Sequence, residues 1–308
     1  MSSIPNISAN AKWIQNGVTV TGGHGQGNGL NQFNKPCDIS IDENQTIYVA
    51  DYKNHRIVEW KKDATNGRIV AGGNGAGNQN DQLNAPTCVV VDEKTDSLII
   101  SDWSNRRIMR WPRQNGTRGD VFIHDVRSYG MAIDSERYLY VSDWDQHEVR
   151  RWRIGDRSGH VVAGGNRKGN RLDQLYGPRG VFVDKDQSVY VVDYNSHRVM
   201  KWLKGAQEGI VVAGNQGQGN SLSQLTDPWG VVVDQLGRVY VADQSNHRIM
   251  RWCAGSREAS VIVGRNGQGQ ATNQLNQPLN LSFDGENNLY VVDYGNHRIQ
   301  KFNVEVKV

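Results

Sequence analysis

The sequence predicts an all-β fold: a six-bladed β-propeller made of four-stranded antiparallel blades. A motif of the form Asp-x-x-Asn-His-Arg-aliphatic-x-x-aromatic occurs, with variations, six times. Successive copies are 50 or 51 residues apart, except for one interval of 41, and no segment carries an amphipathic helical period. A fixed period of this size indicates one supersecondary unit that is repeated. The copies begin at Asp51, Asp102, Asp143, Asp193, Asp243 and Asp293.

Residues 72–111 illustrate the repeat. A polar, Gly-rich loop leads to two short strands rich in aliphatic residues, at 88–92 and 97–102. Residues 107–111 then alternate polar and apolar side chains, as a half-buried strand does. A fourth strand is clearest in other copies, for example at 210–213. Four short strands in each copy are typical of a propeller blade.

The two ends of the array predict how the ring closes. The last copy ends near residue 302 without a Gly-rich loop, and residues 17–22 resemble a fourth strand that lacks the three before it. We therefore expect 17–22 to complete the blade that begins near residue 281, which leaves no open sheet edge. This divides the chain into an N-terminal extension, residues 1–16, and a single propeller, residues 17–308.

Composition narrows the functional classes. A formal net charge of +3 gives little nonspecific attraction to nucleic acid. No apolar stretch approaches the roughly 20 residues of a membrane helix, and the N-terminus lacks the features of a secretory signal. Three cysteines are too few for a disulfide framework. We expect a soluble monomer with no membrane contact, and the compartment stays open.

The Asn-His-Arg-Ile signature follows an aliphatic-x-Val-x-Asp strand and precedes an aromatic residue, and it resembles the NHL-repeat family of six-bladed propellers over about residues 17–302. The resemblance implies that the first strand of each blade lines the axis. It also implies that the Gly-rich loops and the Asp-x-x-Asn connections share one face, here called the upper face. The third copy departs from the pattern, because its Gly-rich loop is missing and Gln146 and Glu148 replace the usual Asn and Arg.

Residues that recur in every copy are interpreted as structural. We expect the strand-ending Asp to accept backbone N–H bonds in its own turn, and the Asn and Arg to form hydrogen bonds locally or between blades. The recurring histidines lie in separate blades, too far apart to share a metal ion. The aromatic residue that ends each third strand should pack between blades. These aromatic residues are Trp60, Trp111, Trp152, Trp202, Trp252 and Phe302.

Residues that differ between equivalent positions are the candidates for function. They follow the loop proline or the strand-ending Asp, and they should line the mouth of the axial channel on the upper face. Exposed aromatic residues mark recognition surfaces, although the same rings could instead pack on the Gly-rich loops. The predicted ligand-binding residues are Asp38, Tyr52, Trp103, Tyr129, Trp144, Arg179, Tyr194, Trp229 and Tyr294.

The favoured hypothesis is a non-enzymatic recognition module without a cofactor or metal. It would bind a protein, peptide or glycan partner around the channel. No nucleophile elbow, zinc-protease or phosphate-loop motif occurs in the sequence.

The resemblance leaves alternatives open. NHL propellers also bind RNA, and Lys53, Arg167, Lys168 and Arg179 could form a modest basic edge. Similar propeller lyases and lactonases hold an axial metal. Tyr129, Arg179, Asp38 and Asn280 are of suitable types for such a site, but no histidine occupies the mouth positions. A purely structural scaffold is a third possibility.

Overall fold

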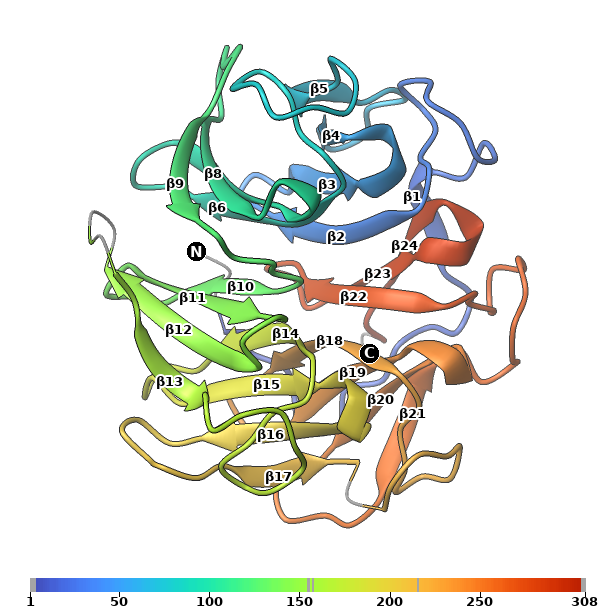
Figure 1. The fold of residues 1–308 in the computed structure, drawn as a ribbon. Coiled ribbons are helices and arrows are strands. Elements are labelled where there is room, and N and C mark those ends of the chain that lie inside the picture. Colours follow the sequence, from blue (N-terminus) through green and yellow to red (C-terminus); the bar gives the residue numbers. More distant parts are fainter. Residues whose placement is uncertain (1–3, 154–155, 157, 215, 306–308) are drawn as a thin grey trace.

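Six four-stranded antiparallel sheets surround a central axis in the computed structural model, which describes residues 4–153, 156, 158–214 and 216–305 (Figure 1). Blades 1 to 3 follow the order of the chain. Blade 1 contains β2 (Pro36–Ile41), β3 (Ile47–Asp51), β4 (Arg56–Trp60) and β5 (Arg68–Gly72). Blade 2 contains β6 (Pro86–Asp92), β7 (Ser97–Asp102), β8 (Arg107–Pro112) and β9 (Asp120–His124). Blade 3 contains β10 (Met131–Ile133), β11 (Tyr138–Asp143), β12 (Glu148–Arg153) and β13 (His160–Gly164).

Blades 4 to 6 complete the ring. Blade 4 contains β14 (Pro178–Val183), β15 (Val189–Asp193), β16 (Arg198–Trp202) and β17 (Ile210–Ala213). Blade 5 contains β18 (Pro228–Val233), β19 (Val239–Asp243), β20 (Arg248–Trp252) and β21 (Ala259–Val263). Blade 6 contains β22 (Pro278–Phe283), β23 (Leu289–Asp293), β24 (Arg298–Phe302) and β1 (Val18–Gly22).

The ring closes as the sequence predicted. Strand β1, from the N-terminal part of the chain, pairs antiparallel with β24, so that Val18 lies opposite Lys301 and Gly22 opposite Arg298. Figure 1 shows the N-terminal strand β1 beside the C-terminal strand β24. The six sheets therefore form one closed ring with the two ends of the chain sharing a blade.

Single turns of 3-10 helix connect the second and third strands of five blades. They are η1 (Tyr52–Asn54), η2 (Trp103–Asn105), η3 (Tyr194–Ser196), η4 (Gln244–Asn246) and η5 (Tyr294–Asn296). The residue after each turn has left-handed backbone, for example His55 with φ 55° and Arg106 with φ 54°. Such a conformation is uncommon for a residue other than glycine, and a specific contact of the histidine, described below, accompanies it.

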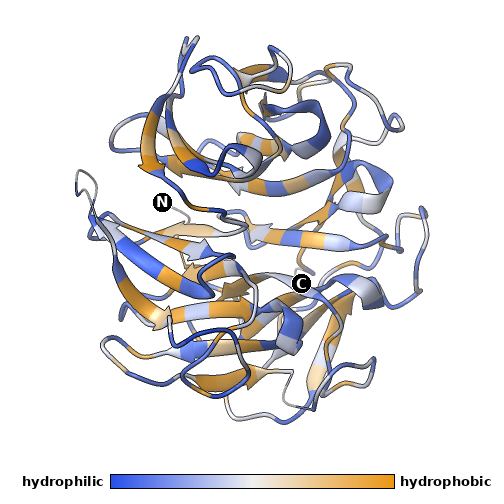
Figure 2. Cartoon of the chain, viewed as in Figure 1, coloured by the Kyte–Doolittle hydropathy of each residue, from blue (hydrophilic) through white to orange (hydrophobic). Residues whose placement is uncertain are grey.

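The hydrophobic core lies between neighbouring blades. Figure 2 shows hydrophobic residues concentrated along the strands and hydrophilic residues in the connections. The aromatic residues that end the third strands are all buried, which confirms their predicted packing role. Trp111 of blade 2, for example, belongs to one cluster with Tyr48 and Ile57 of blade 1.

The N-terminal segment packs against the lower ends of blades 5 and 6. Ile7 is fully buried and Trp13 is 2% exposed. Arg238 donates to the backbone carbonyl oxygens of Ile7, Ser8 and Ala9 at 2.8 to 3.0 Å, and Trp13 Nε1 donates to the Asn287 carbonyl at 3.1 Å. Residues 4–16 are thus part of the folded unit. No helix in the described part of the chain is long and apolar enough to cross a membrane.

Candidate functional site

The strand-ending aspartates hold the Gly-rich loops in place. Asp51 Oδ1 accepts the Asn34 N–H at 2.8 Å, while its Oδ2 accepts Asn54 Nδ2 at 2.7 Å and Arg56 Nε at 2.8 Å. The expectation that this Asp serves its own turn is therefore wrong for blade 1, because the backbone partner lies in the preceding Gly-rich loop. Blades 2, 4, 5 and 6 repeat the loop contact. Only where the loop is missing, at Asp143, does the carboxylate accept N–H groups of its own turn.

The recurring arginine also binds the Gly-rich loop. Arg56 donates to the carbonyl oxygens of Asn28, Gly29 and Gln32 at 2.8 to 3.0 Å in addition to Asp51. Asn54 Nδ2 also donates to the Gly27 carbonyl at 2.9 Å. Each complete repeat therefore uses its Asp, Asn or Arg side chains to bind the loop that enters the blade, which confirms the predicted structural role of the Asn and Arg.

The recurring histidine joins one blade to the next. His55 Nδ1 accepts the N–H of Ala85, which lies directly before β6, at 3.0 Å, and His247 Nδ1 accepts the Gln277 N–H at 3.0 Å. The same bond forms at His147, His197 and His297. An Nδ1 that accepts a hydrogen bond must be unprotonated, so these contacts require neutral imidazole rings.

Acidification is expected to weaken the ring through these histidines. Burial lowers the pKa of His55, His147, His247 and His297 below the usual value of 6.5. As the pH falls below about 6.5, the unfolded chain binds protons before the folded one, so stability that is present at pH 7 is lost. Urea unfolding at pH 7.0 and pH 5.5 should therefore show a smaller fall in stability for His247→Gln than for the unaltered protein. An identical fall in both proteins would contradict this role.

Blade 3 is anchored differently from the others. Arg106 of blade 2 takes the histidine position and forms ion pairs with Asp125 and Asp145. In place of the Gly-rich loop, buried hydroxyl groups secure the start of β10. Thr87 Oγ1 and Ser101 Oγ donate to the Ser128 carbonyl at 2.6 and 2.7 Å. Ser142 Oγ accepts the Gly130 N–H at 3.1 Å.

Five aromatic rings from four blades meet on the upper face around Arg179. We call this group the mouth cluster, and it consists of Trp103, Tyr129, Trp144, Arg179, Tyr194 and Trp229. The centre of the Tyr129 ring lies 5.6 Å from Trp103, 5.4 Å from Trp144 and 5.2 Å from Trp229. Tyr194 lies 6.1 Å from Trp144 and 6.4 Å from Trp229. Residues that are distant in sequence, from blades 2 to 5, thus form one continuous group.

The guanidinium of Arg179 lies among these rings. Its central carbon is 3.3 Å from the centre of the Tyr194 ring and 3.6 Å from that of Trp229. Tyr129 and Trp144 follow at 5.0 and 5.4 Å. Burial lowers the pKa of Arg179 from 12.5 to about 10, so the side chain is still charged at neutral pH. The mouth cluster is therefore a cation enclosed by aromatic faces, an attractive arrangement for both partners.

The other three predicted ligand-binding residues, Tyr52, Tyr294 and Asp38, lie outside the mouth cluster. Tyr52 and Tyr294 are half-buried and, like Trp229, pack against the hydrophobic cluster shared by blades 1 and 6. Lys53 lies 4.9 Å above the Tyr52 ring, and Lys35 lies 4.4 Å above Tyr294. Asp38 is only 3% exposed and lines the wall of the axial cavity, below the rim.

The axial cavity is small. Its volume is about 110 Å³, and first-strand residues of all six blades line it together with Pro5 of the N-terminal segment. A volume of this size holds a few water molecules, whereas drug-sized ligands need at least about 300 Å³. Three glycines allow neighbouring first strands to lie close together around the axis. A Cβ added to Gly130, for instance, would lie 2.3 Å from the Arg179 carbonyl oxygen.

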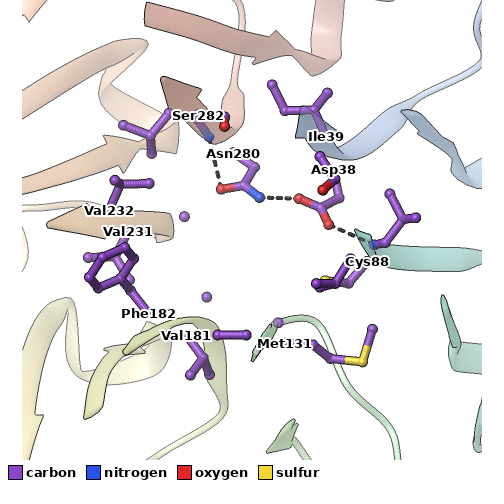
Figure 3. Close-up of a pocket in the computed structure, with 18 of the residues that line it drawn as sticks. Asp38, Ile39, Cys88, Met131, Val181, Phe182, Val231, Val232, Asn280 and Ser282 are labelled. Atoms are coloured by element: carbon purple, nitrogen blue, oxygen red, sulfur yellow. Dashed lines mark hydrogen bonds between the residues drawn. The ribbon is translucent and has the colours of Figure 1, made fainter. Parts of the chain in front are cut away.

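Polar groups in this cavity bind one another. Asp38 accepts the Val89 N–H at 2.8 Å and a hydrogen bond from Asn280 Nδ2, and Asn280 Oδ1 accepts the Leu281 N–H (Figure 3). Burial raises the pKa of Asp38 and that of the Cys88 thiol beside it. These contacts join blades 1, 2 and 6 near the axis. Among the described residues, no group of three or more His, Cys, Asp and Glu side chains is placed to hold a metal ion.

Two features were not predicted from the sequence. One is the packing of the N-terminal segment, to which Arg238 contributes; the other copies have no arginine at this position, so it carries no repeat signal. The hydroxyl anchor of blade 3 has a weak signal, because Ser101 and Ser142 stand where the other copies have Ala or Val.

Comparisons with known proteins agree with this architecture. The family model of the NHL repeat matches residues 33–60, 175–202, 225–251 and 275–302, which lie in blades 1, 4, 5 and 6. No curated protein sequence matches the chain significantly.

Several solved structures share the fold. An auxiliary nutrient binding protein from Bacteroides thetaiotaomicron is 16% identical with a TM-score of 0.72, over 96% of this chain and 78% of that one. A catalytically inactive virginiamycin B lyase from Staphylococcus aureus, with quinupristin, is 11% identical with a TM-score of 0.59, over 96% of this chain and 99% of that one. A nidogen/laminin complex contains a chain that is 14% identical with a TM-score of 0.59, over 88% of this chain and 85% of that one. At such identities the likeness concerns the fold alone.

Proposed function

This chain is a six-bladed β-propeller that carries NHL repeats, and from that premise we propose that it is a recognition module whose ligand binds the mouth cluster on the upper face. The ligand would be a protein, peptide or glycan that contacts several aromatic rings at once. The rest of the ring serves to hold these side chains at fixed positions.

The observation that carries the proposal is the convergence of five aromatic rings and one guanidinium over the axis. Tryptophan, tyrosine and arginine are the residue types that supply most binding energy in recognition surfaces. The rings come from blades 2 to 5, and at the equivalent position in blade 5 the aromatic residue is replaced by Gln244. Tyr129, Arg179 and Trp229 stand at a position where blades 1, 2 and 6 have Cys37, Thr87 and Leu279. The centre of the group is therefore specific to one side of the ring and is not a product of the repeat.

The structural roles of the other polar residues also favour the upper face as the binding surface. The recurring Asp, Asn and Arg side chains bind the Gly-rich loops, and the recurring histidines accept N–H bonds between blades. The axial cavity, at about 110 Å³, is too small to enclose a ligand of the usual size. A ligand of that size therefore does not fit inside the axial channel.

Binding should depend on the mouth cluster and not on tyrosines elsewhere on the same face. An array of oligosaccharides and peptides is probed with the unaltered protein, and the strongest ligand is then measured against Tyr194→Ala, Trp229→Ala and Tyr176→Ala. Tyr176 is the matched control, because it is 40% exposed, lies in a Gly-rich loop and is outside the mouth cluster. Truncating a central aromatic anchor costs about 2 kcal/mol or more, so the first two variants should bind at least about thirtyfold more weakly.

The control variant should bind within about twofold of the unaltered protein, because a rim contact contributes little. Circular dichroism and the thermal midpoint of each variant establish that it is folded. Equal binding by Trp229→Ala, Tyr194→Ala and the unaltered protein would show that the ligand binds elsewhere and would refute the proposal.

A further inference from the structure

Arg179 differs from the other buried arginines of the described chain. Arg198, at the same 8% exposure and in the same blade, donates to Asp193 at 2.8 Å and to two loop carbonyls. Arg179 makes no hydrogen bond or ion pair with any described residue, and its Nε and Nη1 atoms are buried without a partner. A buried charged side chain is normally hydrogen-bonded and also paired with an opposite charge. The contacts with Tyr194 and Trp229 supply attraction to the charge, but they leave the N–H donors without acceptors.

Carboxylates near the mouth do not supply the missing acceptor. Asp227, whose charge raises the pKa of Arg179 against the effect of burial, accepts Ser245 Oγ at 2.7 Å and lies 3.7 Å from His197. Asp38 is held by Val89 and Asn280 within the channel wall. On the opposite side of the mouth, Lys35 and Lys53 add two further cations. The described mouth is therefore positively charged.

Tyrosine hydroxyl groups add further donors. Burial raises the pKa of Tyr129 and of Tyr294 to about 12, so both stay protonated at neutral pH. Neither hydroxyl forms a hydrogen bond with a described residue. The mouth thus presents several hydrogen-bond donors and three cations, and no side chain of the mouth supplies an acceptor to Arg179.

We infer that the ligand of the mouth cluster is a saccharide that carries a carboxylate, with the carboxylate bound by Arg179 and the sugar ring packed on the aromatic rings. This inference rests on the proposed function. A guanidinium matches a carboxylate in shape and charge, and tyrosine and tryptophan rings combine large apolar faces with polar edges. One enclosed guanidinium suits one carboxylate, whereas a nucleic acid requires clustered lysines and arginines along its phosphates.

An extended peptide fits the site less well. One common mode of peptide binding adds a strand to a free sheet edge. The free edges of the inner strands face a cavity of only about 110 Å³, which cannot hold an added strand. The flat rings at the mouth lie above this level and offer stacking surfaces instead of backbone partners.

Binding requires a movement of one aromatic ring. Tyr194 and Trp229 lie directly against the guanidinium, and both are only half-buried. A carboxylate reaches the covered nitrogen atoms when one of these rings turns aside. The tryptophan fluorescence should therefore change on binding, and the change should be smaller in Trp229→Phe.

Calorimetry with two related sugars tests the inference. The probes are trigalacturonic acid and its carboxyl-reduced, neutral form. The unaltered protein should bind the acid at least about tenfold more tightly, because a hydrogen bond to a charged group contributes that much. Arg179→Met should lose most of this preference, because Lys35 and Lys53 remain at the mouth, and Arg179→Lys should keep more of it. Arg171→Met is the matched control, because this exposed arginine of the same blade pairs with Asp173 outside the mouth, and it should keep the full preference.

The outcomes separate the inference from the proposed function. Equal binding of both sugars by the unaltered protein, or a preference for the acid that is undiminished in Arg179→Met, overturns the inference. Failure of both sugars to bind also overturns it. In each of these cases the proposed function still stands if another array ligand is bound and lost in Trp229→Ala, and it falls if no such ligand exists.

Discussion

Replacing Arg198 with methionine is expected to lower the free energy of unfolding by about 3–5 kcal/mol, the usual loss when one partner of a buried ion pair is removed. Asp193 is fully buried, and burial already raises its pKa, while Arg198 is one of the groups that oppose the rise. Without the guanidinium, Asp193 is left without its cation, and the carbonyl oxygens of Arg171 and Gln174 lose their donor. Urea unfolding followed by circular dichroism at pH 7 measures this effect.

The exposed pair formed by Arg171 and Asp173 provides a reference for this experiment. Asp173→Ala should leave the unfolding midpoint unchanged, because exposed pairs are screened by water and salt. If Arg198→Met and Asp173→Ala were equally stable, the repeated Asp and Arg would not stabilise the fold as their hydrogen bonds indicate.

Replacing Trp13 with alanine is expected to lower the free energy of unfolding by about 3–5 kcal/mol, which is typical when a buried tryptophan is truncated. Trp13 is 2% exposed, contacts the rings of Tyr240 and Phe283, and donates to the Asn287 carbonyl. Its removal leaves a cavity between the N-terminal segment and blades 5 and 6. The same urea experiment measures the loss.

Ile14 is the matched control for this variant. It is the next residue in the chain but is 45% exposed, so Ile14→Ala should change the free energy of unfolding by no more than about 0.5 kcal/mol. A Trp13→Ala protein as stable as Ile14→Ala would mean that the N-terminal segment adds little to the ring.

The fold could be predicted from the sequence because the same pattern of strands and turns occurs in six copies. Each copy gives the same order of apolar strands, turn residues and terminal aromatic residue, so an ambiguity in one copy is resolved by the others. The isolated strand at residues 17–22 and the incomplete last copy together predicted the closure that β1 and β24 form. The irregular segment before Val18 has no such redundancy, and its packing depends on contacts of single residues, such as those of Arg238 with Ile7, Ser8 and Ala9 and of Trp13 with Asn287.

The candidate site could be predicted in part. Comparison of equivalent positions brought out the rings and Arg179, because these positions differ between blades. Their mutual contacts could not be predicted, since the distance from Arg179 to Tyr194 and Trp229 depends on side-chain directions in two blades at once. The same limit applies to Asp38, whose sequence position resembles that of a rim residue but whose side chain bonds with Val89 and Asn280 inside the channel wall.

The difference between repeated and variable positions explains why two buried arginines of blade 4 have different roles. Arg198 occupies a repeated position, and every N–H partner it has belongs to the framework. Arg179 occupies a position that differs in all six blades and has aromatic rings but no acceptor around it. The first residue holds the fold together, and we propose that the second is kept for a ligand.

The most direct test compares the urea unfolding of Arg198→Met and Arg179→Met, since both arginines are 8% exposed. Arg179→Met loses cation–π attraction of about 2 kcal/mol per close ring but also removes a buried charge that lacks a hydrogen-bonded partner, a comparable penalty. Its free energy of unfolding should therefore stay within about 1 kcal/mol of that of the unaltered protein, while Arg198→Met loses about 3–5 kcal/mol. Equal and large losses in both variants would make Arg179 one more part of the framework and would contradict the assignment of the mouth cluster to binding.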